Sequence, residues 1–197
     1  MVHHPLLALA LFLAATTGAR AASVAVEVHG ADGKPLSGAI VAVEGSRIGK
    51  AAVRGPYQIE QRDIAFAPSV LIVPVGATVG FPNRDRVRHH VYSFSAAKRF
   101  DLKLYGRDDT RTVVFDTAGI VALGCNIHDR MSGFVYVAAS PFAEQTDAAG
   151  RVRFDGVPAG AVTIRVWHPS IRSGGNTLAQ AVALAPTGFA TTVSIKR

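Results

Sequence analysis

The sequence predicts an all-β protein built from β-sandwiches. Short segments with apolar residues at alternate positions recur along the chain, as in half-buried strands. Turn-forming Gly, Pro, Asn and Asp residues separate them at intervals typical of a sandwich or barrel. No amphipathic helix of convincing length interrupts this pattern. A length of 197 residues allows one domain or two small ones.

The expected strands fall into three stretches of the chain. The first stretch contributes residues 24–28 and 39–43, and a polar, turn-rich segment follows at 45–56. The expected strands of the central stretch are residues 64–66, 70–73, 78–81, 91–94, 100–105, 112–115, 120–123 and 134–137. The last stretch contributes residues 152–154, 162–167 and 190–195, with glycine-containing turns between the first two.

The N-terminus is expected to be a signal peptide. Residues 6–15 form an apolar run that is too short to span a bilayer. An Ala-Arg-Ala sequence at 19–21 then places small residues at the positions that a signal peptidase reads. We therefore expect residues 1–22 to be removed on export to the periplasm and no later membrane span. An uncleaved membrane anchor is the alternative.

The charge of the chain narrows the class of partner. The formal net charge is +7, and the basic residues are scattered rather than gathered in one run. They are denser around the first pair of histidines, at Arg84, Arg86, Arg88, Lys98, Arg99 and Lys103. This density has two interpretations, a solvated surface or a surface that steers an acidic partner or membrane. Nucleic acid is not expected, because no basic helix or aromatic-basic platform is present.

Residues 124–131 combine three side chains that bind soft metals. They include Cys125, the only cysteine of the chain, and Met131, the only methionine apart from the initiator. Cys125, His128 and Met131 offer a thiolate, an imidazole and a thioether, which are ligands of trigonal copper sites with a weak axial sulfur. An exported chain with one cysteine cannot form an internal disulfide, so a metal explains why this thiol is present.

The second imidazole of such a site must come from elsewhere in the chain. His89 and His90 lie upstream in a stretch of strand character, and the residues alone do not choose between them. Zinc is disfavoured, because it prefers more thiolate or carboxylate and gains nothing from Met131.

Residues 64–137 resemble the cupredoxins, the class of plastocyanin, amicyanin and azurin. The resemblance rests on the loop Cys125-x2-His128-x2-Met131 and on an upstream series of matching positions. That series is Phe66, Pro68, Leu71, Val73, Gly76, Val79, Phe81, Asn83, Asp85 and His89-His90-Val91. The resemblance implies one type-1 copper ion held by His89, Cys125, His128 and Met131, with His90 at a position where relatives have Asn. The pattern also resembles bacterial methylamine utilisation proteins.

The flanks resemble a second family, the carboxypeptidase regulatory-like domain with its prealbumin-like sandwich. The matching residues are mostly turn chemistry, including Asp32-Gly33 near the start and the segment 146–160 near the end. The expected organisation is therefore a cupredoxin-like Greek-key sandwich at 56–139 and a split prealbumin-like sandwich at 23–55 and 140–197. Alternatively, the flanks are extra strands of one enlarged domain.

These features predict a periplasmic type-1 copper protein that transfers electrons by cycling between Cu(II) and Cu(I). Its expected partner is a redox protein such as a cytochrome c or a periplasmic dehydrogenase, and an acidic one would match the basic residues near the first histidines. The alternatives are a copper carrier or storage protein and an adhesion or scaffold module without metal. An enzyme is not expected, because the sequence has neither further histidine clusters for a catalytic copper nor a recognisable hydrolase or phosphate-loop motif.

Overall fold

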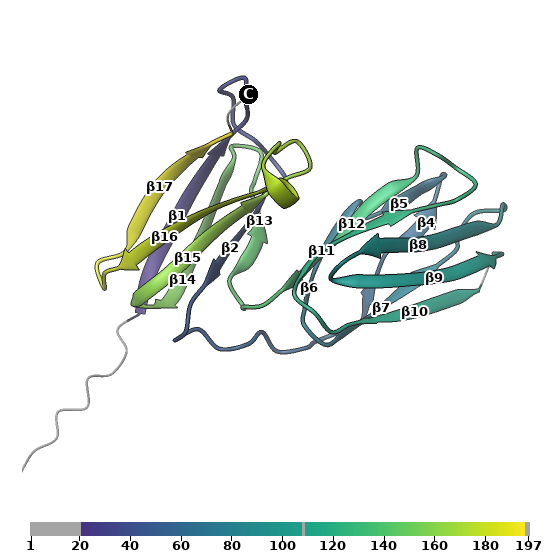
Figure 1. Cartoon of the computed structure of the whole chain (residues 1–197), viewed down its shortest axis with the longest axis horizontal. Helices are drawn as coiled ribbons and strands as arrows, with labels where there is room; N and C mark the ends of the chain where they lie inside the picture. The colour runs from purple at the N-terminus through teal and green to yellow at the C-terminus, as the bar shows by residue number, and fades with distance from the viewer. Residues whose placement is uncertain (1–20, 108, 196–197) are drawn as a thin grey trace, which may run out of the picture.

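A computed structural model describes residues 21–107 and 109–195 and confirms the all-β prediction. Its strands form two lobes that lie side by side (Figure 1). We call them the flank unit, made of strands from both ends of the chain, and the central unit, made of β3 to β12. The signal-peptide prediction falls mostly on residues 1–20, which lie outside the described residues. No helix in the described part of the chain is long and apolar enough to cross a membrane.

The flank unit is a sandwich of a three-stranded and a four-stranded sheet. The sheet orders are β14-β1-β17 and β13-β2-β15-β16. The strands are β1 (Ala21–His29), β2 (Ile40–Glu44), β13 (Ala143–Gln145), β14 (Arg151–Pro158), β15 (Gly160–Trp167), β16 (Thr177–Leu184) and β17 (Phe189–Ser194), with a short 3-10 helix at Gly174–Asn176. Strand β1 pairs antiparallel with β14 and parallel with β17, so the two ends of the chain close one fold.

Alternation along β1 explains how the flank unit forms its core. Val24, Val26 and Val28 are buried at every second position and point between the two sheets. The intervening Glu27 lies on the outer face, where Arg151 of the neighbouring strand donates to it at 3.1 Å. This is the pattern expected when one face of a sheet is packed and the other is solvated.

The central unit encloses a second core between two further sheets, ordered β10-β7-β3 and β6-β12-β11-β8-β9. The strands are β3 (Tyr57–Gln58), β4 (Glu60–Arg62), β5 (Ala65–Ala67), β6 (Val70–Pro74), β7 (Ala77–Pro82), β8 (His89–Ser95), β9 (Lys98–Tyr105), β10 (Thr110–Phe115), β11 (Gly119–Gly124) and β12 (Ser132–Ala138). Strands β4 and β5 form a small hairpin. Phe81, Phe115 and Val91 are fully buried in this core.

Strand β12 belongs to the central unit, but alternate side chains of this strand face the core of the central unit and the flank unit. Val135 and Val137 belong to the core of the central unit. Tyr136 and Ala138 point the other way and form a third apolar cluster with Trp167 and other residues of the flank unit. Only residues 139–142 separate β12 from β13, so the connection between the two units is short on this side.

Trp167 is the largest side chain of this third cluster. It is 1 % exposed, and its ring lies 4.9 Å from that of Phe134 at a steep angle. We expect Trp167→Ala to lower the free energy of unfolding by about 3–5 kcal/mol, because a large cavity would open between the units. Circular dichroism during chemical denaturation measures this. Phe94→Ala, at a side chain that is 76 % exposed, is the control and should change stability little.

Strand β16 was not expected from the sequence. The segment contains three alanines, at positions 179, 181 and 183, and has few of the β-branched and aromatic residues that mark strands. Its pairing with β15 over all eight residues supplies the strand instead. Tertiary pairing here overrides weak local preference.

Candidate metal centre

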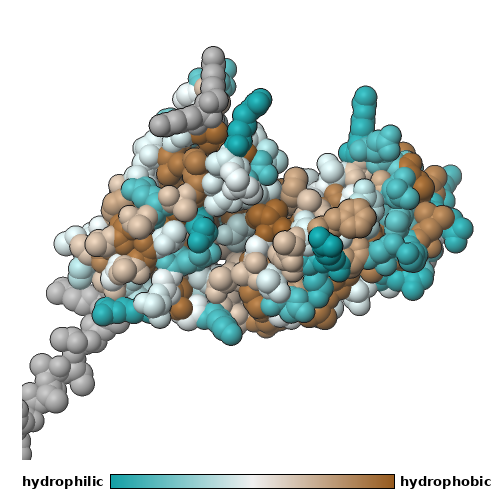
Figure 2. All heavy atoms as spheres, viewed as in Figure 1, coloured by the Kyte–Doolittle hydropathy of each residue, from teal (hydrophilic) through white to brown (hydrophobic). Residues whose placement is uncertain are grey.

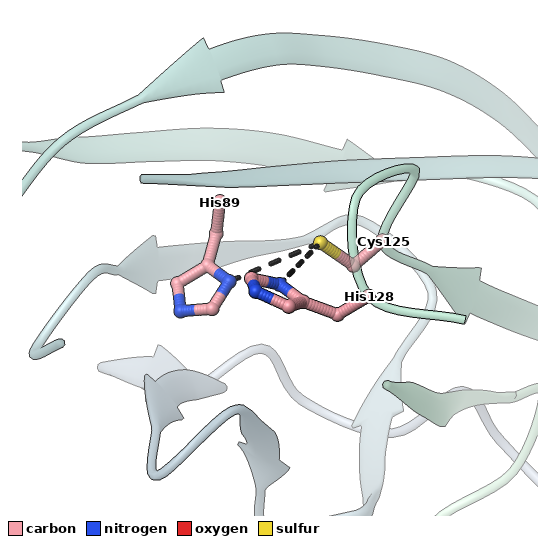
Figure 3. A group of neighbouring side chains, drawn as sticks. All are labelled: His89, Cys125 and His128. Carbon is pink, nitrogen blue, oxygen red and sulfur yellow. Dashed lines mark hydrogen bonds between the residues drawn. The ribbon is translucent and has the colours of Figure 1, made fainter. Parts of the chain in front are cut away.

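Three of the predicted ligands meet at one end of the central unit (Figure 3). His89 opens β8, while Cys125 and His128 lie in the loop between β11 and β12. The Cys125 Sγ lies 3.8 Å from His89 Nδ1 and 3.6 Å from His128 Nδ1. One ligand atom from each residue falls within 4.8 Å of the others, although His89 is 36 residues from Cys125 in sequence. The pairing of β8 with β11 brings them together.

The three candidate ligands are largely shielded from solvent, as in a buried metal site. His89 is fully buried, Cys125 is 4 % exposed and His128 is half-buried. Cys125 has no disulfide partner among the described residues. Two imidazole nitrogens and one thiol sulfur that converge in a nearly dry pocket are the donor set of a type-1 copper site. The residues present therefore fit that ion.

The glycines on either side of the ligand loop allow close packing. A Cβ on Gly124 would lie 2.7 Å from Cζ of Tyr92, whose ring covers this position. A Cβ on Gly133 would lie 3.1 Å from the side chain of Phe66. Neither glycine has a positive φ, so contact with neighbouring strands rather than backbone freedom accounts for them. Between them, the Met131 N–H donates to the His128 carbonyl at 2.8 Å and closes a tight turn.

Met131 lies in the apolar core of the central unit. Its side chain is 2 % exposed and belongs to the same buried cluster as Cys125. The thioether is thus held out of water in the core that also contains Cys125.

His90 points away from the three converging ligands. Its Nε2 contacts the Asp101 carboxylate, and its ring lies 5.6 Å from that of Tyr92 on the outer face of the sheet. Successive residues of a strand face opposite sides, so His89 and His90 do not share a site. His29 and His168 lie in the flank unit, where His29 contacts Glu27 and His168 contacts Ser170.

Asp85 supports His89 from behind and is a functional residue that the sequence did not reveal as such. Its Oδ2 lies 2.7 Å from His89 Nε2. An ionised carboxylate only accepts hydrogen bonds, so Nε2 carries a proton, and in the neutral ring the lone pair of Nδ1 then faces Cys125. The sequence pattern included Asp85, but only as part of a motif without an assigned role.

The same carboxylate also holds the turn of the β4–β5 hairpin. The N–H groups of Asp63 and Ile64 donate to it at 2.8 and 3.0 Å. Both residues have positive φ, a strained conformation that these hydrogen bonds help to hold. Burial acts to raise the pKa of Asp85, but the hydrogen bonds from Ile64, His89 and Asp63 outweigh it and lower the pKa below its usual value.

Asn83 fixes the loop that carries Asp85. Its side chain is fully buried, and its Nδ2 donates to the carbonyls of Val87 at 2.9 Å and Tyr105 at 3.3 Å. Its Oδ1 accepts from the Asp85 N–H at 2.9 Å. The hydrogen bonds of Asn83 therefore hold the backbone of Asp85 in place, independently of the contact between the Asp85 side chain and His89.

In structure, less than half of this chain is similar to solved copper proteins. No protein-family model and no curated protein matches the chain. A purple cupredoxin from Nitrosopumilus maritimus is 27 % identical over 42 % of this chain and 100 % of that one, with a TM-score of 0.38. A copper-containing nitrite reductase from Thermus scotoductus is 26 % identical over 45 % of this chain and 25 % of its own, with a TM-score of 0.40. A reduced amicyanin is 23 % identical over 49 % of this chain and 98 % of its own, with a TM-score of 0.39.

Proposed function

We propose that this chain is a periplasmic electron-transfer protein with one type-1 copper ion. The ligands are His89, Cys125 and His128, with Met131 as a weak axial donor. The observation that carries the proposal is the convergence of two Nδ1 atoms and the Cys125 sulfur in a buried pocket. Copper bound there supplies a one-electron couple between Cu(II) and Cu(I).

The chain contributes rigidity to this function. The Asp85 carboxylate orients the His89 ring. Strands β8 and β12 both pair with Gly124, the residue before Cys125, and so fix the start of the ligand loop. Ligands that the protein holds in fixed positions move little when the metal gains or loses an electron. A small rearrangement favours fast electron transfer. His128 is half-buried, so this ligand is the part of the candidate site that reaches the protein surface.

The protein surface around the candidate metal centre is charged, which is relevant to the kind of partner it would bind. Hydrophilic side chains gather at the end of the central unit away from the flank unit (Figure 2), where β8 begins. Part of the basic density is neutralised, since Arg84 pairs with Glu60 and Lys103 with Asp101. Arg86 and Arg88 stay exposed beside the Asp85 loop. We therefore propose an acidic redox protein as the partner, such as a cytochrome c or a periplasmic dehydrogenase.

The Asp85 contact gives a test of how the ligand histidine is held. We expect Asp85→Ala to weaken copper affinity roughly 10–100-fold, because His89 loses the acceptor that fixes its tautomer and orientation. Competition with a copper chelator measures the affinity. Asp101→Ala removes the partner of His90 and serves as the matched control, with an expected affinity equal to that of the parent.

The axial position gives a second test. Met131→Leu should keep colour and copper while raising the reduction potential, because a weak donor to Cu(II) is lost. Met131→Gln should lower the potential, because an amide oxygen is a harder ligand that favours Cu(II). Cyclic voltammetry of both variants and the parent decides the matter, and equal potentials would mean that Met131 is packing alone.

Voltammetry of the parent also separates electron transfer from copper storage or carriage. A reversible one-electron couple in a coloured protein supports the proposed function. Tight, colourless Cu(I) binding without such a couple would favour the carrier. Absence of any copper binding would favour an adhesion or scaffold module.

A further inference from the structure

The ring of Tyr92 lies across Gly124, the residue that precedes Cys125 in the chain. The three atoms nearest to a Cβ built on Gly124 all belong to Tyr92: Cζ at 2.7 Å, Oη at 2.8 Å and Cε1 at 3.1 Å. The ring therefore occupies the space that any side chain at position 124 would need. Mechanism and ligand geometry have so far given this tyrosine no role.

The contact joins the two strands that carry the ligands. Strand β8 begins with His89, and strand β11 leads directly into Cys125. Tyr92 and Gly124 form the one ladder pair between β8 and β11 that the described residues show. The spacing between the two ligands therefore depends on how firmly this pair holds together.

The neighbouring connections of β8 are weaker or farther from the ligands. On the β9 side, the register shifts between His90 and Tyr92, so the ladder is interrupted close to the ligand His89. On the β11 side, the next link is a side-chain hydrogen bond, in which the Ala122 N–H donates to Ser95 Oγ at 2.9 Å. The pair under the aromatic ring is thus the link between the strands that lies nearest in sequence to both ligands.

The Tyr92 ring is held in its place by rings on both sides. The Phe94 ring lies 5.2 Å away and the His90 ring 5.6 Å away, both tilted, which is a favourable arrangement for aromatic pairs. His90 is itself tied to Asp101, which also accepts from the Lys103 N–H at 2.8 Å. The Tyr92 hydroxyl has no hydrogen-bond partner among the described residues, so the ring carries the contact.

From these contacts we infer that Tyr92 is a positioning residue of the metal centre. Its ring, packed on Gly124, keeps β8 and β11 together and so holds the Cys125 sulfur close to the His89 imidazole. The inference rests on the proposed copper site. Groups that hold the ligands of a metal in place commonly affect both its affinity and its electronic properties.

The first test needs no metal. Cys125 is the only thiol of the chain, so a chromogenic disulfide reagent reports on it alone in the metal-free protein. Tyr92→Ala should react several-fold faster than the parent, because the start of the ligand loop opens more often. Tyr92→Phe keeps the ring and should react at the parent rate. Chemical denaturation of each variant gives its global stability, so that reaction through complete unfolding can be subtracted.

A variant of the glycine tests the same contact from the other side. In Gly124→Ala the added methyl group should displace the Tyr92 ring, so the thiol should react as fast as in Tyr92→Ala. The double variant should then react no faster than either single variant, because both changes break one contact.

The second test uses the copper-loaded chain. Tyr92→Ala and Gly124→Ala should bind copper roughly 10-fold more weakly and shift the thiolate-to-copper band, while Tyr92→Phe should keep both properties of the parent. A Tyr92→Ala variant with the labelling rate and band of the parent would overturn the inference. So would effects that add in the double variant, or a Tyr92→Phe variant that behaves like Tyr92→Ala. If the parent binds no copper, the proposed function fails, whereas the labelling rates still decide whether Tyr92 holds Cys125 in place.

Discussion

Replacing Cys125 with serine is expected to abolish the coloured copper site. The sulfur of Cys125 is the one thiol of the chain, and it lies within 3.8 Å of the Nδ1 atoms of both His89 and His128. A hydroxyl cannot replace a covalent thiolate donor to Cu(II), so intense thiolate-to-copper absorption should vanish completely. Visible absorption of the variant after addition of one equivalent of Cu(II) measures the effect.

A control must separate loss of the ligand from damage to the core. Val121→Thr adds a hydroxyl at a fully buried position of the same cluster without removing a donor. It should lower stability and keep the colour. Circular dichroism of both variants should show the all-β fold. An absorption band that survives Cys125→Ser would exclude this cysteine as the ligand.

The second large effect is expected at His89. Its ring is fully buried with Nδ1 towards Cys125, whereas His90 faces outward to Asp101. His89→Gly should therefore lose the copper site, while His90→Gly should keep it. Free imidazole should restore colour to His89→Gly, because the space left by the side chain admits a ring in its place.

The pair of histidines also tests the register of β8. A one-residue shift would exchange the facing sides of His89 and His90. In that case the His90 variant would lose copper and respond to imidazole. Chelator competition on both variants under identical conditions gives the comparison.

The ligand loop could be predicted from sequence because its donors are local. Cys125, His128 and Met131 lie within seven residues, and their chemistry is distinctive. The choice of His89 over His90 needed the family resemblance, because side-chain alternation separates the two histidines but does not say which faces the core. The all-β class followed from alternating apolar residues, as along β1.

Other features depend on contacts that no local pattern contains. Asp85 acts on His89 and on the turn at Asp63 and Ile64, and these meet only once the β4–β5 hairpin has folded beside the loop. The outward face of β12 looks like any alternating strand, yet Tyr136 and neighbouring residues pack against the flank unit. Strand β16 exists through pairing with β15 rather than through its own composition.

A titration of the purified chain with Cu(II), followed by visible absorption, tests the central claim most directly. The claim is that one copper ion binds between His89, Cys125 and His128. It predicts an intense thiolate-to-copper band that rises linearly and stops at one equivalent of metal. A titration that gives only weak absorption, or no binding, would contradict it.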